Sequence, residues 1–282
     1  MPGGEISAAA AQTTLGQSVT VEGVGLHTGA DCRLVMHPAA ADTGIVFEVA
    51  RGRSLLQIPA ALEWAVRGER CTGLERDGAR VETVEHLLAA LAEVGIDNVR
   101  VEVAGAECPA LDGSARPYVE AIDRAGNESL EAAREERILR HHVWVAEGDS
   151  WLMATPAQER RITVGIDFPR LGRQVVDFVL APEVFRREIS PARTPAFEEE
   201  VESLIAQGLG RGGSHDNVVV VTREGVLRDA RFADEIARHK ALDLLGDLSL
   251  AGRVRAHVWA IRPGHGVNLE LARKMAAAAH TA

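Results

Sequence analysis

The sequence EHLLAAL at residues 85–91 has a weaker counterpart in RHKALDL at residues 238–244, and this pair decides the fold. Each stretch places a histidine on an expected helix that ends near a glycine. An alternating strand then begins 13 residues after the first histidine (86 to 99) and 15 after the second (239 to 254). The repeated order indicates an internal duplication. We therefore expect an α+β fold of two duplicated two-layer α/β sandwich domains, each a sheet with helices on one face, whose histidine-bearing helices meet at a cleft.

The patterns on either side of these stretches set the expected domains. A first α+β domain is expected over residues 12–126 and a second over 137–278, joined by a polar linker at 127–136. Thr83 is expected to cap the first histidine helix and Gly95 to end it in a left-handed conformation. The other expected elements are strands at 18–21, 32–36, 45–49, 99–103, 217–222 and 254–261, a hairpin of 162–168 with 174–180, and helices at 117–125, 197–207 and 232–245.

Composition and charge narrow the function classes. Of 282 residues, 46% are hydrophobic, which suits a globular protein with a core. Lys and Arg number 31 against 41 Asp and Glu, and the formal charge of −10 argues against a general nucleic-acid or anionic-membrane binder. Three widely spaced cysteines without a C-x-x-C pair argue for a reducing compartment. No apolar run reaches the roughly 18 residues of a membrane span, and the N-terminus does not resemble a secretory signal, so we expect a cytoplasmic protein.

A polar stripe on the second helix is the first candidate for chemistry. His239, Asp243 and Asp247 are spaced i, i+4 and i+8, so they share one face of a helix. A histidine and a carboxylate one turn apart can bind one metal ion. A solvated helix face with an incidental histidine has the same spacing, and for this motif alone that explanation is the commoner one.

Two further histidines extend the candidate site. Glu85 and His86 stand at the start of the first helix, where a glutamate also simply complements the helix dipole. In the functional interpretation His86 is a third ligand and Glu85 a general base beside an open coordination position, where zinc lowers the pKa of water to about 7. His265 lies between Gly264 and Gly266 after a strand, either in a plain surface turn or as an acid that protonates a leaving amine.

Two glycine-rich runs, GVGLHTG at 23–29 and GRGGS at 210–214, predict turns, because neither lies at the strand-to-helix junction of a dinucleotide fingerprint or P-loop. The residues alone leave two metal-dependent reactions open. Two histidines and one carboxylate suit zinc hydrolysis, but they are also the ligand set of non-haem Fe(II) oxygenases. Glu85 beside His86 favours hydrolysis, since an oxygenase has less need of a carboxylate base there.

Taken in order along the chain, the motifs resemble those of the UDP-3-O-acyl-N-acetylglucosamine deacetylase family, the zinc amidases of lipid A biosynthesis. The resemblance covers roughly residues 12–275. Each motif is short, but their number and order make the resemblance specific. The matching segments are 23–29, 83–87, 95–98, 111–114, 192–194, 212–214, 238–243, 246–248 and 264–266.

The resemblance implies a zinc-dependent amide hydrolase with its active site between the two domains. The implied site residues are the metal ligands His86, His239 and Asp243, the general base Glu85, the acid and electrostatic stabiliser His265 with its orienting partner Asp247, the oxyanion hydrogen-bond donor Thr194, and the substrate-binding residues Lys240, Phe197 and His27. Fe2+ in place of Zn2+ stays open, because the ligand set accepts either.

The implied reaction removes acetate from the 2-amino group of a UDP-linked, 3-O-acylated glucosamine, an early committed step of lipid A biosynthesis. The acyl chain is expected to run through the second domain beside a hairpin insert near Val164 to Val179. The expected partners are this acylated UDP-amino sugar and no nucleic acid, with any peripheral membrane contact made through the acyl substrate. We expect a monomer.

One departure from the family pattern concerns the substrate. The family's aromatic residue after the oxyanion threonine is replaced by Pro195, with Phe197 two residues further on. Proline fixes φ and removes an N–H donor, which is expected to affect sugar or acyl specificity and not the metal chemistry. Two alternatives follow: a divergent homologue that deacetylates a different N-acyl amino-sugar nucleotide, or one that binds such a molecule without turnover.

Overall fold

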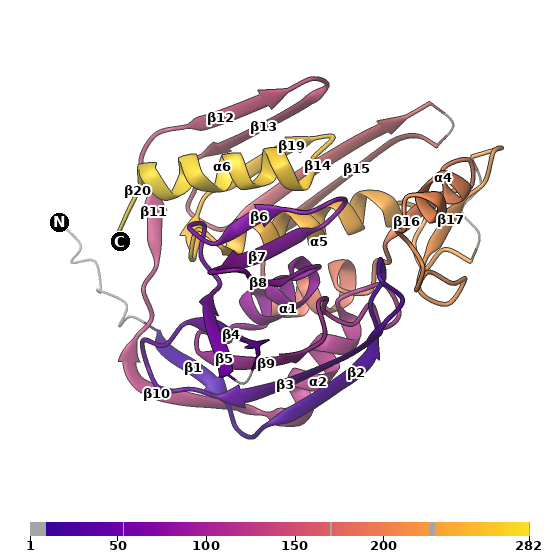
Figure 1. Cartoon of the computed structure of the whole chain (residues 1–282). Helices are drawn as coiled ribbons and strands as arrows, with labels where there is room; N and C mark the ends of the chain where they lie inside the picture. Colours follow the sequence, from indigo (N-terminus) through magenta and orange to yellow (C-terminus); the bar gives the residue numbers. More distant parts are fainter. Residues whose placement is uncertain (1–9, 53, 170, 226–228, 282) are drawn as a thin grey trace.

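The computed structural model describes residues 10–52, 54–169, 171–225 and 229–281, and its two halves repeat one sheet topology (Figure 1). The first sheet has the order β2 (Val19–Val24), β3 (Asp31–Pro38), β9 (Val99–Ala104), β4 (Ile45–Arg51) and β5 (Ser54–Pro59). The second has the order β12 (Val143–Glu147), β13 (Ser150–Thr155), β19 (His257–Ile261), β14 (Arg161–Phe168) and β15 (Gly172–Val179). In each sheet only the third and fourth strands are parallel. The predicted α+β fold and its duplication are confirmed.

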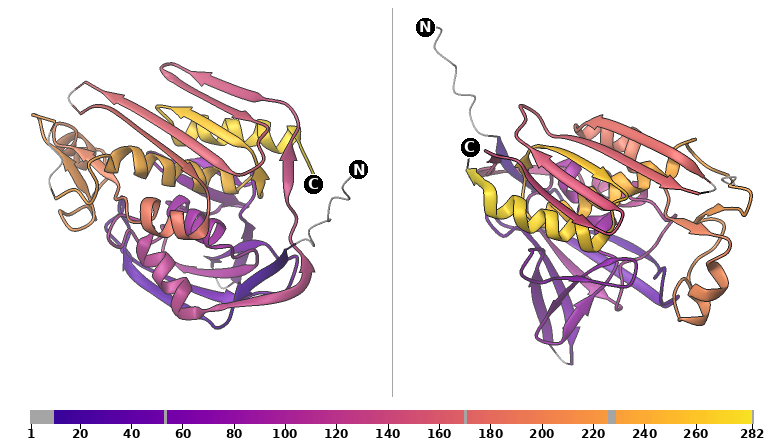
Figure 2. Two further views of the ribbon diagram at one scale, coloured as in Figure 1. Left: turned by 180° about the vertical axis from the view of Figure 1, so that it is seen from behind. Right: turned by 90° about the horizontal axis from the view of Figure 1, so that it is seen from above.

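A layer of helices lies between the two sheets (Figures 1 and 2). The first half contributes α1 (Glu85–Val94) and α2 (Arg116–Ala125), and the second contributes α5 (Glu235–Ser249) and α6 (His265–Ala278). α1 packs on both α2 and α5, and α5 also packs on α6. The sequence of α1 is apolar on almost every side, and nine of its ten residues are buried. A helix with that pattern needs neighbours all round, and α2, α5 and the first sheet supply them.

α1 and α5 approach each other closely at Gly246. A Cβ built at this glycine would lie 2.1 Å from the carbonyl oxygen of Glu85, a backbone atom that cannot turn aside. The contact between α1 and α5, which brings the two histidine stretches together, therefore requires a glycine at position 246.

Replacing Gly246 by alanine is expected to lower the free energy of unfolding by about 1–3 kcal/mol, because the helices must separate to admit the methyl group. The clash outweighs the higher helix propensity of alanine, which is worth about 1 kcal/mol. Urea denaturation measures the change. The control is Ser249→Ala on the same helix, whose hydroxyl donates to the Gly246 carbonyl and to no other acceptor among the described residues. A Gly246→Ala protein as stable as the wild type would show that the helices do not need this close approach.

Two inserts occupy corresponding places, each between the fifth strand of a sheet and the following histidine helix. The first is an antiparallel sheet of β6 (Ala65–Arg67), β7 (Thr72–Arg76) and β8 (Ala79–Val81). The second is a parallel pair, β16 (Pro195–Phe197) and β17 (Val219–Val221), joined through α4 (Val201–Ala206). It follows the short helix α3 (Pro182–Val184) and a π-helical turn at Phe185–Ile189.

Several expectations about local structure are corrected. The hairpin near 164–179 is no insert, because β14 and β15 belong to the main sheet and correspond to β4 and β5. The expected linker 127–136 contains β10 (Asn127–Ala133), which pairs with β1 (Ala11–Leu15). The expected helix 197–207 is helical only over α4, because its first residue ends β16. The remaining strands are β11 (Arg137–Leu139), β18 (Val254–Arg255) and β20 (Ala279–Thr281), which form one small sheet.

The expected helix ends are half right. Gly95 ends α1 with φ of 91° and donates its N–H to the carbonyl of Leu91, as predicted. The expected cap is wrong: Thr83 has φ of 57° and its hydroxyl donates to Glu107, while Val84 precedes the helix. No helix within the described ranges has both the length and the hydrophobicity that a bilayer crossing requires.

Candidate metal centre and its surroundings

Three potential ligands meet where α1 and α5 face each other. His86 comes from the first turn of α1, and His239 and Asp243 come from successive turns of α5. All three are buried, and their ligand atoms lie within 4.8 Å of one another. Oδ1 of Asp243 lies 3.5 Å from Nε2 of His86 and 3.2 Å from Nε2 of His239. The two imidazole rings are perpendicular, with centroids 5.0 Å apart.

The outer atoms of two ligands are held by hydrogen bonds. Nδ1 of His239 lies 3.1 Å from the carbonyl oxygen of Ala192, which can only accept, so this nitrogen carries the proton. Nζ of Lys240 donates to Oδ2 of Asp243 at 2.8 Å. These bonds turn Nε2 of His239 and Oδ1 of Asp243 toward the centre of the cluster. Such outer partners commonly fix ligand orientation in metal sites.

The charge states of the cluster suit a cation. Burial lowers the pKa of His239 to about 3, so its imidazole is neutral. Burial opposes ionisation of Asp243, but the neighbouring His239 imidazole and Lys240 ammonium outweigh it and hold the pKa of this carboxyl well below its usual range. A neutral imidazole and an ionised carboxylate are the forms that bind metals. Nε2 of His239 therefore points a lone pair at a carboxylate oxygen of Asp243. Two such acceptors repel each other, and a divalent cation bound between them would remove the repulsion. The residues therefore fit a metal ion.

Glu85 lies beside the cluster, at the start of α1. Its side chain is buried, and Oε2 accepts a hydrogen bond of 3.0 Å from the backbone N–H of Thr72 on β7. Burial raises the pKa of Glu85, although the nearby imidazoles of His265 and His86 act in the other direction. A carboxylate with a raised pKa is suited to accept a proton near neutral pH.

His265 forms a second group with Asp247. Nδ1 of His265 lies 3.0 Å from Oδ2 of Asp247, which is fully buried on α5. Burial lowers the pKa of His265, but the charge and hydrogen bond of Asp247 outweigh it and raise the pKa to about 9. The sequence alone leaves open whether His265 lies in a plain surface turn after Gly264. In the structure Gly264 precedes α6, and His265 is the first residue of that helix.

Two residues that the sequence analysis missed complete this hydrogen-bond network. The hydroxyl of Thr72 donates to Oδ1 of Asp247 at 2.5 Å and lies 3.2 Å from Nδ1 of His265. The side-chain amide of Asn268 donates to Oδ2 of Asp247 at 2.8 Å. Thr72 thus contacts Glu85 through its N–H and Asp247 through its hydroxyl. Neither residue belongs to a recognisable local motif, so only the folded chain reveals them.

The expected substrate residues lie in different surroundings. Lys240, which was expected to contact the substrate, donates a hydrogen bond to Asp243. Thr194 lies at the entry to the second insert, where its N–H donates to the carbonyl of Gly113 and its carbonyl accepts from Val219. The ring of Phe197 packs on Phe168, with centroids 4.9 Å apart.

His27 lies in the first glycine-rich run. The backbone N–H groups of His27 and Thr28 donate to the carboxylate of Glu107, and Nδ1 of His27 is buried without a hydrogen-bond partner among the described residues. The two glycine-rich runs touch each other. The N–H of Gly212 donates to the carbonyl of Leu26 at 3.0 Å. They are turns, as expected, and they also form part of the contact between the two halves.

Comparison with known proteins gives a consistent result. A sequence model of the family described as UDP-3-O-acyl N-acetylglycosamine deacetylase matches residues 12–277. Three relatives carry the name UDP-3-O-acyl-N-acetylglucosamine deacetylase. The protein of Syntrophotalea carbinolica is 41% identical over 94% of this chain and 88% of its own length. Those of Myxococcus xanthus and Thermosynechococcus vestitus are each 45% identical, over 94% and 95% of this chain and 86% and 95% of their own lengths.

Proposed function

Since the chain belongs to the UDP-3-O-acyl N-acetylglycosamine deacetylase family, we propose that the cluster between α1 and α5 is the active site of a zinc-dependent deacetylase. The protein is a hydrolase of lipid A biosynthesis that removes the N-acetyl group from a UDP-3-O-acylated N-acetylglucosamine. The single observation that carries the site assignment is that three buried ligands, a buried glutamate and a protonated histidine meet in one place between the halves.

His86, His239 and Asp243 would hold the metal. A bound Zn2+ supplies a Lewis acid for the acetamide carbonyl and makes water more acidic. The donor set of two imidazoles and a carboxylate is common to catalytic zinc and to Fe(II), and the glutamate beside it favours hydrolysis. Lys240 keeps Oδ2 of Asp243 occupied, so that Oδ1 is the oxygen left for the metal.

Two residues are assigned to the proton transfers, one as the proton acceptor and one as the proton donor. Glu85 takes a proton from the water that attacks the acetamide carbon. The imidazolium of His265 gives a proton to the departing 2-amino nitrogen, and the products are acetate and the free amine. Asp247 keeps His265 protonated at neutral pH, and Thr72 and Asn268 keep Asp247 in place. Thr194 is the proposed hydrogen-bond donor to the oxyanion.

The substrate residues are proposed from their positions around this centre. His27 lies in the turn that contacts the second glycine-rich run, and Phe197 lies in the second insert. The rings of Phe168 and Phe197 offer an apolar wall for the acyl chain. We assign the contact with the acyl chain to this insert together with the end of β14, which carries Phe168. Cys32, Cys71 and Cys108 are free and buried, which supports a reducing, cytoplasmic setting.

Acetate release from UDP-3-O-(3-hydroxyacyl)-N-acetylglucosamine tests the proposal. We expect turnover with zinc and none after chelation, with recovery when zinc is returned. The same sugar nucleotide without its 3-O-acyl chain is expected to react more slowly. Equal rates with the two compounds would favour a different N-acyl amino-sugar nucleotide as substrate. No turnover by protein that still binds one metal would favour the non-catalytic alternative.

Replacing Asp247 by asparagine is expected to shift the pH dependence of kcat/KM. His265 donates a proton only while its pKa exceeds the pH, so activity falls as the pH rises through that pKa. Removing a neighbouring negative charge lowers a histidine pKa by about 1–3 units, and the alkaline limb should move to lower pH by that amount. The control is Asp167→Asn, which alters an exposed ion pair on β14. An unmoved alkaline limb in Asp247→Asn, with normal metal content, would remove His265 from the role of acid.

A further inference from the structure

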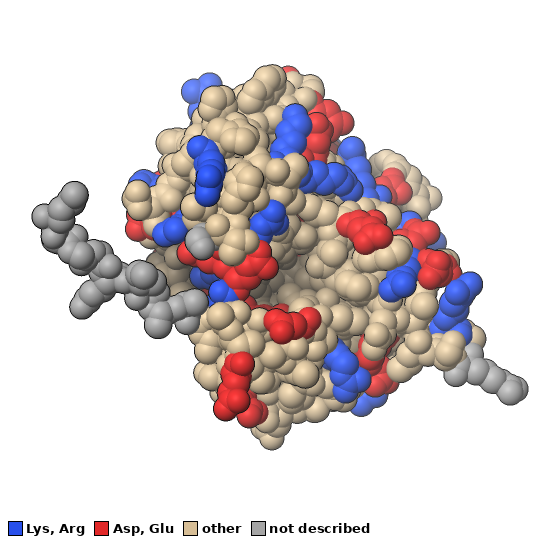
Figure 3. Space-filling model, turned by 90° about the vertical axis from the view of Figure 1, so that its left-hand side faces the viewer, with Lys and Arg blue, Asp and Glu red and all other residues tan. Residues whose placement is uncertain are grey.

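A cavity lies between the two halves, near the ends of α1 and α5 that are remote from the metal ligand His86. Its volume is about 420 Å³, and it is lined by residues near the C-terminal ends of α1 and α5, whereas the metal ligands lie at the start of α1 and in the first half and middle of α5. The side of the molecule that carries β11 and β20 is hollowed between its upper and lower parts (Figure 3). This volume is in the range of small-molecule sites in proteins.

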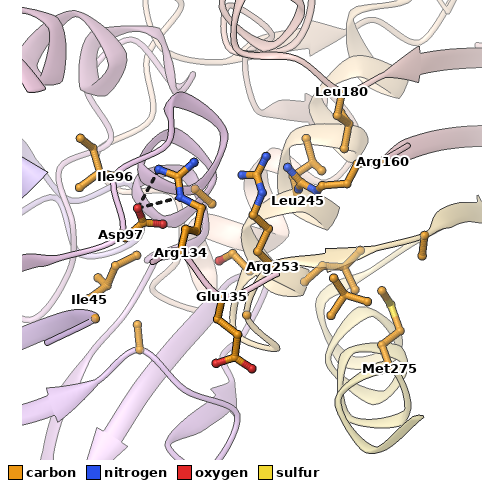
Figure 4. Close-up of a pocket in the computed structure, with 18 of the residues that line it drawn as sticks. Ile45, Ile96, Asp97, Arg134, Glu135, Arg160, Leu180, Leu245, Arg253 and Met275 are labelled. Atoms are coloured by element: carbon orange, nitrogen blue, oxygen red, sulfur yellow. Dashed lines mark hydrogen bonds and ion pairs between the residues drawn. The ribbon is translucent and has the colours of Figure 1, made fainter. Parts of the chain in front are cut away.

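Three arginines reach into this cavity in a row (Figure 4). Arg134 donates from Nε to Asp97 at 2.8 Å, and Arg160 donates from Nη1 to Glu93 at 3.0 Å. Each of these guanidinium groups is therefore matched by a carboxylate at the end of α1 or just after it.

Arg253 differs from its two neighbours. Among the residues that the structure describes, no carboxylate pairs with its guanidinium group and no acceptor bonds it. Burial lowers the pKa of Arg253, and the charges of Arg160 and Arg134 lower it further. The charges of Glu93 and Glu136 act on this pKa in the other direction.

The two carboxylates that act on Arg253 are engaged elsewhere: Glu93 accepts a hydrogen bond from Arg160, and Glu136 lies 3.6 Å from Nε of Arg255. The half-buried guanidinium of Arg253 therefore keeps unused donors, and an anion is the ligand that fits them.

The acidic residues at the rim do not fill this role. Asp42 is exposed and accepts a hydrogen bond from Gln12 at 2.7 Å. Glu135 is exposed, accepts from Thr281, and its carboxylate points away from the guanidinium groups (Figure 4). Within the described part of the chain, neither of these carboxylates bonds Arg253, so its donors are available to a ligand.

Apolar side chains from both halves also line the cavity. Ile45 and Ile96 belong to the first half, and Leu180, Leu245 and Met275 belong to the second. A bare inorganic anion would leave these side chains without a partner. A molecule with a charged head and a hydrocarbon part can contact both the arginines and the apolar side chains of the cavity.

We propose that this cavity is a binding site for a small anionic amphiphile, whose carboxylate or phosphate ester pairs with Arg253 and whose hydrocarbon part lies against Ile96 and Leu245. The site is separate from the metal centre, and its existence does not depend on the proposed reaction. Because its walls come from both halves, an occupant bridges them and stabilises their contact.

Calorimetric titration of the full chain tests this proposal with three matched probes: decanoate, decyl phosphate and decanol, each below its micelle concentration. We expect at least one of the two anions to bind about tenfold or more tightly than decanol, because a hydrogen-bonded charge pair is formed. The tighter of the two anions identifies the head group. Arg253→Met should remove this advantage, and Arg253→Lys should retain part of it. The control is Arg51→Met, an exposed arginine on β4.

Hydrogen exchange locates the probe, because a decyl chain can also enter the acyl-binding region of the active site. We expect the anion to protect amides near residues 249–258 in the wild type, and this protection to disappear in Arg253→Met. Normal metal content of that variant shows that it is folded. Equal affinity of the wild type and Arg253→Met for both anions would overturn the proposal, and so would protection confined to the second insert, at residues 195–221.

Discussion

Replacing Glu85 by alanine is expected to lower kcat for acetate release by about 10²- to 10⁴-fold, the usual contribution of a general base. The metal content should stay at the wild-type value, because Glu85 is not among the three clustered ligands. Its carboxylate is held by the N–H of Thr72 and has a raised pKa through burial, which are conditions for taking a proton from water at neutral pH.

Steady-state kinetics with elemental analysis of the same samples gives both quantities for Glu85→Ala. Glu85→Gln keeps the shape of the side chain and the acceptor oxygen but cannot take the proton, and it should lose a similar factor. The control is Glu75→Ala, an exposed glutamate on β7. Unimpaired turnover of either Glu85 variant would remove Glu85 from the mechanism.

Replacing Asp243 by alanine is expected to abolish tight metal binding and, with it, turnover. Removal of an outer partner of a ligand already costs about 10- to 100-fold in metal affinity, and the loss of a ligand should cost more. The substitution also leaves the Lys240 ammonium without the carboxylate that it bonds at 2.8 Å, so a positive charge faces the place of the cation. Both effects act in the same direction.

Metal content after dialysis against a weak chelator measures the effect of Asp243→Ala. The control is Asp216→Ala in an exposed loop of the second insert, which should keep its metal. Circular dichroism confirms that the apo variant is folded. Normal metal stoichiometry in Asp243→Ala would contradict the ligand assignment.

Much of the fold could be predicted because the histidine stretches have strong local signals. The run EHLLAAL is helical by periodicity, and Gly95 ends the helix in the left-handed conformation that glycine readily adopts. β10 was missed because its sequence is polar and its pairing with β1 lies far away in the chain. α6 was missed because the glycines around His265 favour a turn, although the residues after them favour a helix.

The candidate site was predictable where its residues share one helix. The spacing of His239 and Asp243 by four residues places both on one face of α5, and His86 follows from the duplication. Thr72 had no such signal, because a strand residue in a small insert contacts Asp247 only after the two halves meet. Lys240 was expected to face the substrate. Its spacing of three residues from Asp243 also allows a bond to that carboxylate, and the sequence alone could not tell which of the two contacts forms.

The two halves of the duplication contribute different residues to the site, and this difference gives the site a direction. Each half presents one histidine, but the residues before them differ: Glu85 precedes His86, whereas Arg238 precedes His239 and is bound to Asp234 and Glu188. Two equal halves would create an active site with two equivalent faces, able to receive a molecule in either of two orientations. In the mechanism that we propose, the proton acceptor Glu85 belongs to one half and the proton donor His265 to the other, so a bound amide would have a single productive direction.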